Sequence, residues 1–210
     1  MARKTKEEAL KTREAILDAA VRIFSVQGVS RTTLATIAKG AGVTRGAIYW
    51  HFKNKEDLLG ALWEQLLLPF EPISLACEDS HEPDPLGKLK SSHVAFFKSL
   101  KEDPRMLQLF RILLTKCETA EDTGTLDLHR VTCHLEGQRK IENILCNAIN
   151  KRQLPENLDV RLAGIATISF IDGLLNNWIM FPDLLDTDKE IPAMLDGLVR
   201  MLACGSFAKT

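Results

Sequence analysis

Several features that would mark specialised protein classes are scarce or missing in this 210-residue sequence. Glycine and proline together supply only 20 residues and no segment repeats, which excludes collagen-like, solenoid and low-complexity chains. No uninterrupted apolar run approaches the roughly 18–20 residues of a membrane span. The charged N-terminus also lacks the apolar stretch of a signal peptide. We therefore expect a cytoplasmic protein that has no contact with a membrane.

Cysteine is sparse and dispersed, and no CxxC pair occurs. The five cysteines are Cys77, Cys117, Cys133, Cys146 and Cys204. The pair Cys133-His134 has no second pair at zinc-finger spacing, so we expect no metal site and no cofactor. Reduced, buried cysteines that pack as small apolar residues are the prediction, and a redox-sensing thiol is the alternative.

The motifs of common enzymes are also missing. The sequence contains no nucleophile elbow, no HExxH and no glycine-rich phosphate loop. His51 has the most suitable side chain for catalysis, but it lies within residues 33–52, whose pattern favours a role other than catalysis. We expect no enzymatic activity. An all-helical small-molecule enzyme and a helical interaction module are the alternatives from other classes.

Charge is distributed unevenly along a nearly neutral chain, which has 27 basic and 28 acidic residues. Residues 1–59 hold eleven Lys or Arg and six Asp or Glu, a net charge of +5. Residues 60–210 hold sixteen and twenty-two, a net charge of −6. This division indicates that the first part of the chain meets a polyanion.

Helix-forming residues with a 3.6-residue apolar period dominate, whereas the β-branched alternation of strands never lasts long. The predicted fold class is all-α, with a compact head at residues 1–53 and a larger helical body at residues 54–210. Helices are expected at 7–27, 34–40, 45–52, from 54 onwards, and at 86–102, 105–117, 122–152, 158–181 and 187–203. Four prolines predict a kinked helix near Pro69–Pro72 and a loop around residues 80–85.

Residues 33–52 have the pattern of a helix-turn-helix. Leu34, Ile37, Ala38, Val43 and Ile48 are spaced so that two short helices share a small core, and a glycine permits the turn between them. With the helix at 7–27 they form a three-helix head.

The second short helix then has an outer side suited to a recognition helix in the major groove, made of Thr44, Arg45, Gly46, Tyr49, Trp50 and His51. Arg45 has the geometry for a bidentate pair with guanine, and Gly46 lets the backbone come close to DNA. Hydroxyl and lysine groups, including Lys53 and Lys55, suit phosphate oxygens.

A different interpretation makes Tyr49, Trp50 and Phe52 core aromatics and the lysines a solvated face. We expect Phe52 to be core. The basic tail at residues 2–6 either lies on a minor groove or phosphates or is a solvated, disordered terminus.

The segment TTLATIAKGAGVTRGAIYWHFKNKEDLL closely resembles the DNA-binding head of the TetR family of transcriptional repressors. Within this family the sequence most resembles the AcrR-like branch, which represses multidrug efflux pump operons. The segments that carry this resemblance are ARKTKEEALKTREAILDAA and ILLTKCE. The resemblance covers residues 7–60 closely. It continues more loosely through KCE at 116–118, LPxxLD at 154–159 and DGLxxxW at 172–178. It implies base or phosphate contacts from Thr33, Thr44, Arg45, Gly46, Tyr49, Trp50, His51 and Lys55.

The resemblance further implies a ligand-binding and dimerisation body, in which the last two helices form a dimer interface. The helix at 158–181 is apolar nearly all round. The next helix has a narrower apolar stripe of Ile191, Met194, Leu195, Leu198, Val199 and Leu202. A homodimer would read a palindromic double-stranded DNA operator. Monomeric core packing is the alternative.

A hydrophobic small-molecule inducer is the implied ligand. The implied cavity residues are Trp63, Leu66, Leu67, Phe70, Phe96, Phe97, Leu100, Phe110, Leu113, Leu114, His134, Ile141, Ile168, Ile171 and Asp172. From the residues alone, core packing is favoured over ligand contact for each apolar member. We expect Asp172 to be buried in an apolar helix, where it either bonds Asn176 or anchors a ligand hydroxyl or amine. Leu67, Phe110 and Thr115 depart from the family's polar choices, which favours a more apolar pocket.

The function that the resemblance implies is repression of a multidrug efflux operon, relieved by hydrophobic compounds. A regulator of another pathway and an activator are alternatives within the family.

Overall fold

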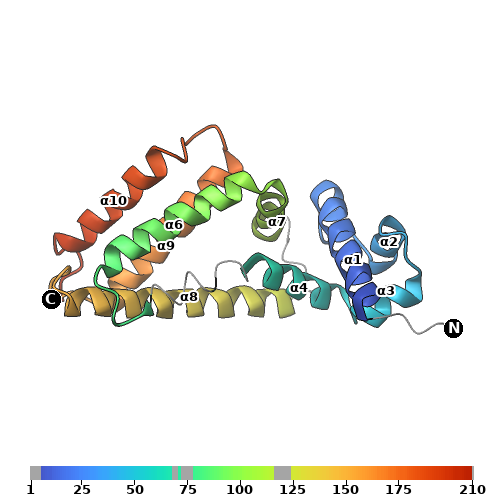
Figure 1. The fold of residues 1–210 in the computed structure, drawn as a ribbon, viewed down its shortest axis with the longest axis horizontal. Helices are drawn as coiled ribbons and strands as arrows, with labels where there is room; N and C mark the ends of the chain where they lie inside the picture. Colours follow the sequence, from blue (N-terminus) through green and yellow to red (C-terminus); the bar gives the residue numbers. More distant parts are fainter. Residues whose placement is uncertain (1–5, 68–70, 72–77, 116–123, 210) are drawn as a thin grey trace. The chain divides into compact units, whose positions relative to one another are not determined.

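The computed structural model describes residues 6–67, 71, 78–115 and 124–209, and most of these residues lie in helices. The helices are α1 (Lys6–Gln27), α2 (Leu34–Gly40), α3 (Arg45–His51), α4 (Lys55–Leu67), α6 (Pro85–Glu102), α7 (Pro104–Thr115), α8 (Gly124–Asn150), α9 (Val160–Met180) and α10 (Glu190–Ala203) (Figure 1). No strand occurs among the described residues, where Leu158 and Ala208 form an isolated β-bridge. The all-α prediction is confirmed, with helix ends within a few residues of those expected. The predicted kink at Pro69–Pro72 lies outside the described residues.

Short-range hydrogen bonds determine where several helices begin and end. Asp84 caps α6 by accepting a bond from the Gly87 N–H at 2.9 Å, and Pro85 occupies the first helical position. Asp159 caps α9 in the same way through the Leu162 N–H at 2.9 Å. Gly28 follows α1 with a φ of +80°, a conformation that favours glycine. These residues all lie close to the ends that they define, so a local sequence pattern is sufficient to predict them.

The chain divides into two compact units. Unit 1 comprises Met1–Leu67 and Arg105–His129, and unit 2 comprises Leu68–Pro104 and Arg130–Thr210. Unit 1 therefore contains α4 and nearly all of α7 in addition to the three helices of the head. These units are defined by how the chain packs, not by what each part does. The functional boundary after residue 53 stays a prediction.

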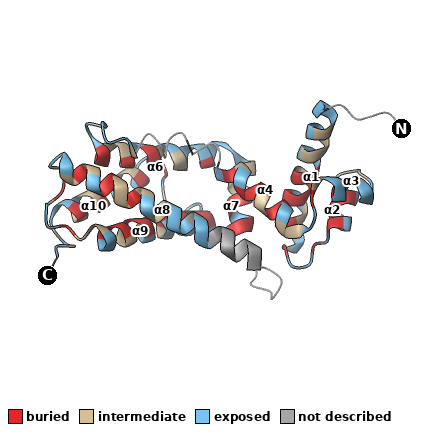
Figure 2. Cartoon of the chain, turned by 90° about the horizontal axis from the view of Figure 1, so that it is seen from below, coloured by how far each residue is buried: buried red, intermediate tan, exposed pale blue. Residues whose placement is uncertain are grey.

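The core of unit 1 draws buried residues from the three helices of the head, from α4 and from α7. Its fully buried members include Ile16, Leu17, Phe24, Ile37, Ile48, Leu58, Leu62, Leu66 and Leu113. Figure 2 shows both buried and exposed residues on α1 and α2. The predicted head core is confirmed for Leu34, Ile37, Ala38 and Ile48, whereas Val43 is half-buried.

Unit 2 packs α6 and α9 against α10. The Phe97 and Trp178 rings meet edge to face with centroids 5.9 Å apart, which joins α6 to α9. The Lys90 ammonium lies 2.5 Å from the Asp196 carboxylate, which joins α6 to α10. From the predicted stripe of α10, the structure buries Ile191, Leu195, Leu198 and Leu202, and leaves Met194 exposed and Val199 half-buried.

Helix α9 is long and apolar enough to span a membrane by length and composition alone. Nine of its residues are buried inside the chain. The hydroxyl of the buried Thr167 donates to the Ala163 carbonyl at 2.8 Å, which satisfies a polar group in the helix interior. The apolar composition of α9 is therefore explained by its place in the core of unit 2.

The prediction of buried cysteines is wrong for Cys146 and Cys204, which are both exposed free thiols. Cys146 lies on an exposed side of α8. Cys204 directly follows α10 and donates from its sulfur to the Arg200 carbonyl at 3.0 Å. The side chains of Cys77, Cys117 and Cys133 lie outside the described part of the chain.

Candidate nucleic-acid interface

Threonine side chains begin both short helices of the helix-turn-helix. Thr33 Oγ1 accepts a hydrogen bond from the Thr36 N–H at 3.2 Å, and Thr44 Oγ1 accepts one from the Ala47 N–H at 3.1 Å. Each bond satisfies an N–H that has no partner inside its helix, which lowers the free energy of a seven-residue helix that is too short to be stable alone. The predicted starts of α2 and α3 are confirmed.

The turn between α2 and α3 is held by backbone bonds. The Ala41 N–H donates to the Ile37 carbonyl at 2.8 Å, and the Val43 N–H donates to the Ala38 carbonyl at 3.0 Å. Gly42 adopts a φ of +67°, which a side chain would strain. The turn therefore sets the direction in which α3 leaves α2.

The outer face of α3 is solvent-exposed. Trp50 is 73% exposed and Tyr49 is 47% exposed, whereas Phe52 is 1% exposed. The interpretation of this cluster as core aromatics is therefore correct for Phe52 and wrong for Tyr49 and Trp50. Two large exposed aromatic side chains beside the exposed Arg45 form a surface that can contact a partner. His51 is half-buried, with its ring centroid 4.6 Å from that of Trp50.

Arg45 is oriented by its own helix. Its guanidinium carbon lies 5.8 Å from the centroid of the Tyr49 ring, one helical turn further along. A cation over an aromatic face at this distance is weakly attracted to it. The contact limits the freedom of an exposed guanidinium and so reduces the entropy lost when it pairs with a base or phosphate.

Gly46 has no structural requirement within the chain. A Cβ atom added there would have Thr44 Oγ1 at 4.0 Å as its nearest described neighbour, and the residue does not have a positive φ. Glycine inside a helix costs about 1 kcal/mol relative to alanine. The open space over this backbone is what close approach by a bound partner requires.

Lys55 has a structural role that was not apparent from the sequence. Its ammonium donates to the carbonyls of Val29 at 3.0 Å, Thr32 at 3.3 Å and Ser30 at 3.5 Å. These bonds join the first residue of α4 to the loop before α2. The partners lie 23 to 26 residues away in sequence, so no local pattern could have indicated them. We call this arrangement the Lys55 clamp.

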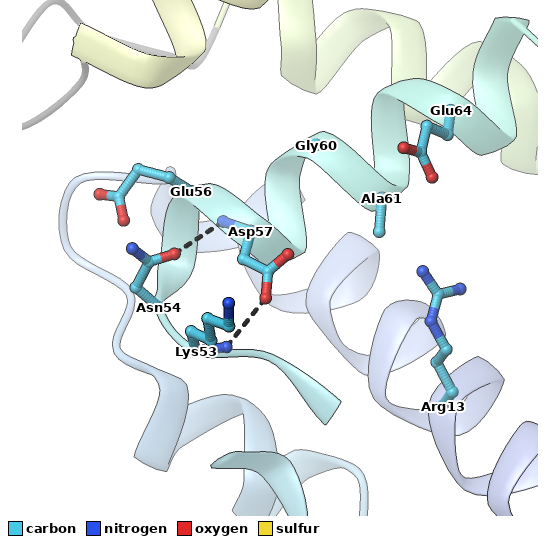
Figure 3. A pocket seen from close by; sticks show the side chains of 8 residues that line it. All are labelled: Arg13, Lys53, Asn54, Glu56, Asp57, Gly60, Ala61 and Glu64. Carbon is cyan, nitrogen blue, oxygen red and sulfur yellow. Dashed lines mark hydrogen bonds between the residues drawn. The ribbon is translucent and has the colours of Figure 1, made fainter. Parts of the chain in front are cut away.

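The first turn of α4 is capped reciprocally by Asn54 and Asp57. The Asp57 N–H donates to Asn54 Oδ1 at 2.8 Å, and the Lys53 N–H donates to Asp57 Oδ2 at 2.9 Å (Figure 3). The second bond goes to the residue before the cap and so differs slightly from a standard capping box.

A pocket of about 420 Å³ lies beside this turn, between α1 and α4. It is lined by Arg13, Lys53, Asn54, Glu56, Asp57, Gly60, Ala61 and Glu64 (Figure 3). Most of these side chains are charged or polar, and none of the described residues predicted to bind the ligand lines it. The pocket therefore does not suit a hydrophobic compound.

The predicted ligand residues of unit 1 are mainly interior. Leu66 and Leu113 are fully buried, and Phe110 and Trp63 nearly so, whereas Leu67 is 40% exposed. The indole N–H of Trp63 is buried and has no hydrogen-bond acceptor among the described residues. A buried donor without an acceptor is destabilising, so it marks a place where a bound acceptor would be favoured. Phe70 and the side chain of Leu114 lie outside the described part of the chain.

The predicted ligand residues of unit 2 are of two kinds. The structure buries Phe97, Leu100, Ile141, Ile168 and Ile171, and Phe96 is half-buried. His134 and Asp172 are exposed instead.

The prediction that Asp172 is buried is wrong, because α9 turns this side chain away from the core. Its carboxylate lies 3.7 Å from His134 Nδ1, and its side chain keeps 58% of its exposure. Partial desolvation raises the pKa of Asp172, and the nearby His134 opposes this increase when protonated.

A three-helix head whose second short helix has an exposed, arginine-bearing and aromatic face defines a helix-turn-helix DNA-binding regulator. The chain belongs to the TetR family. The family model described as bacterial regulatory proteins, tetR family, matches residues 16–62. A second model, described as the C-terminal region of MAATS-type transcriptional repressors, matches residues 84–204.

Known proteins confirm the likeness to the AcrR-like branch. The chain is 40% identical to the HTH-type transcriptional regulator AcrR of Shigella flexneri over 190 residues, which cover 90% of this chain and 88% of that protein. It is similar to NalD, the secondary repressor of the MexAB-OprM multidrug efflux pump in Pseudomonas aeruginosa. That comparison has a TM-score of 0.85 and 32% identity over 94% of this chain and 98% of NalD. It is also similar to SmeT of Stenotrophomonas maltophilia in a complex with triclosan. The TM-score is 0.83, with 31% identity over 95% of this chain and 92% of SmeT.

Proposed function

We propose that this chain is a homodimeric repressor of a multidrug efflux operon that binds a palindromic operator and leaves it when a hydrophobic small molecule binds. The observation that carries the proposal is the exposed outer face of α3. Its relative AcrR is named as a transcriptional regulator, and NalD and SmeT are named as repressors of multidrug efflux pumps. A protein with this role acts in the cytoplasm, where its operator is.

The proposed DNA contacts are Thr33, Thr44, Arg45, Gly46, Tyr49, Trp50, His51 and Lys55. Arg45 is the base-reading residue, because a bidentate arginine–guanine pair is worth about 1–3 kcal/mol of discrimination. Hydroxyl and ammonium groups contact phosphates, which position the helix without reading sequence. The net charge of +5 in residues 1–59 adds non-specific attraction to DNA.

Dimerisation is proposed through α9 and α10. These helices keep exposed apolar side chains at Leu162, Met180 and Met194. A Cβ added at Gly173 would meet nothing within 4 Å among the described residues, and Gly197 is almost as open. Apolar and small residues on two helices allow a second copy to approach closely and form an isologous interface. Two heads about 34–36 Å apart would then read the two halves of a palindrome.

The inducer is proposed to be a hydrophobic compound that has a hydrogen-bond acceptor. The buried indole N–H of Trp63, which has no acceptor in the part of the chain that the structure describes, supports an acceptor within an apolar site. The structure of SmeT with triclosan shows that a relative binds a chlorinated aromatic compound. The other predicted ligand residues remain part of this proposal.

A binding experiment tests both parts of the proposal. Operator DNA is selected from a random-sequence library with the full-length protein, and its affinity is measured by fluorescence anisotropy. Arg45→Ala should weaken the preference for the selected sequence, whereas Lys11→Ala should not, because Lys11 pairs with Glu7 along α1 and lies outside the proposed contact residues. If Arg45→Ala keeps the wild-type preference for the selected sequence, the assignment of α3 as the helix that reads DNA is refuted.

The ligand part is tested by adding triclosan to the same complex, with calorimetry to establish that it is bound. The proposal predicts weaker operator binding, and Trp63→Phe should bind triclosan less tightly because it lacks the indole donor. Unchanged operator affinity with triclosan bound would refute release by the ligand. Tight operator binding without turnover of the bound compound separates this function from the enzymatic alternative.

A further inference from the structure

Four polar side chains form a chain of hydrogen bonds between α1, α4 and α7 within unit 1. The Arg105 guanidinium holds Asp18 Oδ1 with Nε at 2.9 Å and Nη2 at 2.8 Å. Nη2 also donates to Gln65 Oε1 at 3.1 Å, and Gln65 Nε2 donates to Glu14 Oε2 at 2.8 Å. We call these four residues the α1–α4–α7 network.

The position of Arg105 is not explained by the stability of its own helix. It is the second residue of α7, and the first turn of that helix contains no acidic residue. A cation there faces the positive end of the helix dipole, which is unfavourable. Its acidic partner comes from α1, where Glu14 and Asp18 lie one turn apart on one face. The arginine is therefore placed to join helices.

The network is too exposed to act mainly as a source of stability. The side chains of Arg105 and Asp18 are 41% and 47% exposed, and ion pairs so accessible to water add little to the stability of a fold. Its geometry is nevertheless specific, because two guanidinium nitrogens share one carboxylate oxygen and one of them also reaches an amide. Such an arrangement fixes orientation more than it adds free energy.

Gln65 connects the network to the proposed ligand residues. On α4 it lies between Trp63 and Leu66, which are both buried, while its own amide reaches α1 and α7. A shift of α4 that accommodates a ligand beside Trp63 would also move this amide. On the other side of the network, α1 packs against α2, and α2 packs against α3.

We propose that Gln65 and Arg105 are positioning residues that transmit ligand occupancy from α4 and α7 to α1 and so to the DNA-binding face of α3. In the ligand-free protein the network holds α1 in the arrangement that binds the operator. Ligand binding displaces the Gln65 amide, the bonds to Glu14 and Arg105 are lost, and α1 is released from that arrangement. The inference rests on the proposed release of the operator by a hydrophobic ligand.

The test compares variants that break the network with a variant that does not. Gln65→Met removes both amide bonds without changing charge, and methionine matches glutamine in length and helix propensity. Arg105→Met removes the central cation. Lys11→Met is the control for loss of one positive charge in unit 1, because Lys11 contacts Glu7 within α1. The full-length dimer is used with triclosan as the probe.

The quantity measured is the ratio of the operator Kd with saturating triclosan to the operator Kd without it. Such coupling typically amounts to about 5–150-fold. We expect Gln65→Met and Arg105→Met each to reduce this ratio by about fivefold, or to one if the wild-type ratio is below about five. The triclosan Kd should stay within about twofold of the wild-type value. Lys11→Met should keep the wild-type ratio. Exchange of the charges by Asp18→Arg with Arg105→Asp should restore part of the ratio that Arg105→Met loses.

Two results would overturn the inference, and they differ from each other. If triclosan binds the wild-type protein and the ratio is one, the proposed function fails and this inference fails with it. If the wild-type ratio is large and both variants keep it, only the inference fails. A lower Tm in the variants together with a wild-type ratio belongs to this second result, since it reveals a purely structural role.

Discussion

Loss of the Lys55 clamp should destabilise the DNA-binding head. In Lys55→Met the aliphatic stem is preserved, but the carbonyls of Val29, Ser30 and Thr32 lose a charged donor. A hydrogen bond to a charged group is worth about 1.5–3 kcal/mol. Because Lys55 is half-buried and one of its bonds is 3.5 Å long, water replaces part of what is lost. We expect the free energy of unfolding to fall by about 1–2 kcal/mol.

Thermal and urea unfolding measure this effect. For a chain of this length, each kcal/mol lowers the Tm by about 2–4 °C, so Lys55→Met should melt about 2–8 °C below the wild type. Lys53→Met is the matched control, because Lys53 is exposed and only two residues away. Its unfolding free energy should stay within about 0.5 kcal/mol of the wild type. Equal stability of Lys55→Met and Lys53→Met would refute the clamp.

Operator binding separates the clamp from a direct contact between Lys55 and DNA. Loss of one phosphate contact flattens the dependence of log K on log salt concentration by about 0.9. The clamp alone leaves that slope unchanged and acts through stability. If the Lys55→Met slope falls by about one, the ammonium leaves the carbonyls for a phosphate in the complex.

Four further changes test the head and unit 2. Thr44→Ala should cost about 1 kcal/mol of unfolding free energy through loss of the α3 cap, and Thr44→Ser should restore it; equal urea midpoints for both would contradict the cap. Gly46→Ala should raise the unfolding free energy by about 0.5–1 kcal/mol yet weaken operator binding, since the added methyl stands where DNA approaches; unchanged affinity would show that the close approach is not used. Arg45→Ala should reduce discrimination at one base pair by about 1–3 kcal/mol in competition assays, and uniform weakening on all sequences would indicate a phosphate contact instead. Burial lowers the pKa of His93, whose Nδ1 lies 2.7 Å from the Leu89 carbonyl. The unfolded chain therefore binds a proton more readily than the folded chain, and stability should fall as the pH drops below about 6.5. His93→Gln should reduce that acid-side fall in Tm, and an identical pH profile would assign it to other groups.

The helix-turn-helix was predictable because its determinants lie close together in sequence. Thr33 and Thr44 form their cap bonds to residues three positions ahead, and Gly42 adopts its positive φ within the turn itself. The apolar spacing of Ile37 and Ile48 is sufficient to identify which side of each short helix is buried.

Exposure of particular side chains was harder to predict. Asp172 lies in an apolar helix, and apolar composition alone does not say which narrow side of that helix faces water. The same reason accounts for the exposed Cys146, since a small apolar residue is compatible with either side of a helix, whereas Cys204 is exposed just beyond the end of α10. Trp50 is the opposite case, because a short helix has too little buried surface to cover its whole aromatic cluster.

The helical fold, the caps and turn of the head, and the exposed outer face of α3 could all be predicted from the sequence, because each depends on contacts within one or two helical turns. The hydrogen-bond partners of Lys55 and Arg105 could not be predicted in this way. The loop carbonyls that Lys55 binds lie 23 to 26 residues away in sequence. Asp18, which Arg105 binds, lies 87 residues away. Such pairs form only when folding brings distant segments together, and a charged side chain carries no periodic signal that would reveal its partner in advance.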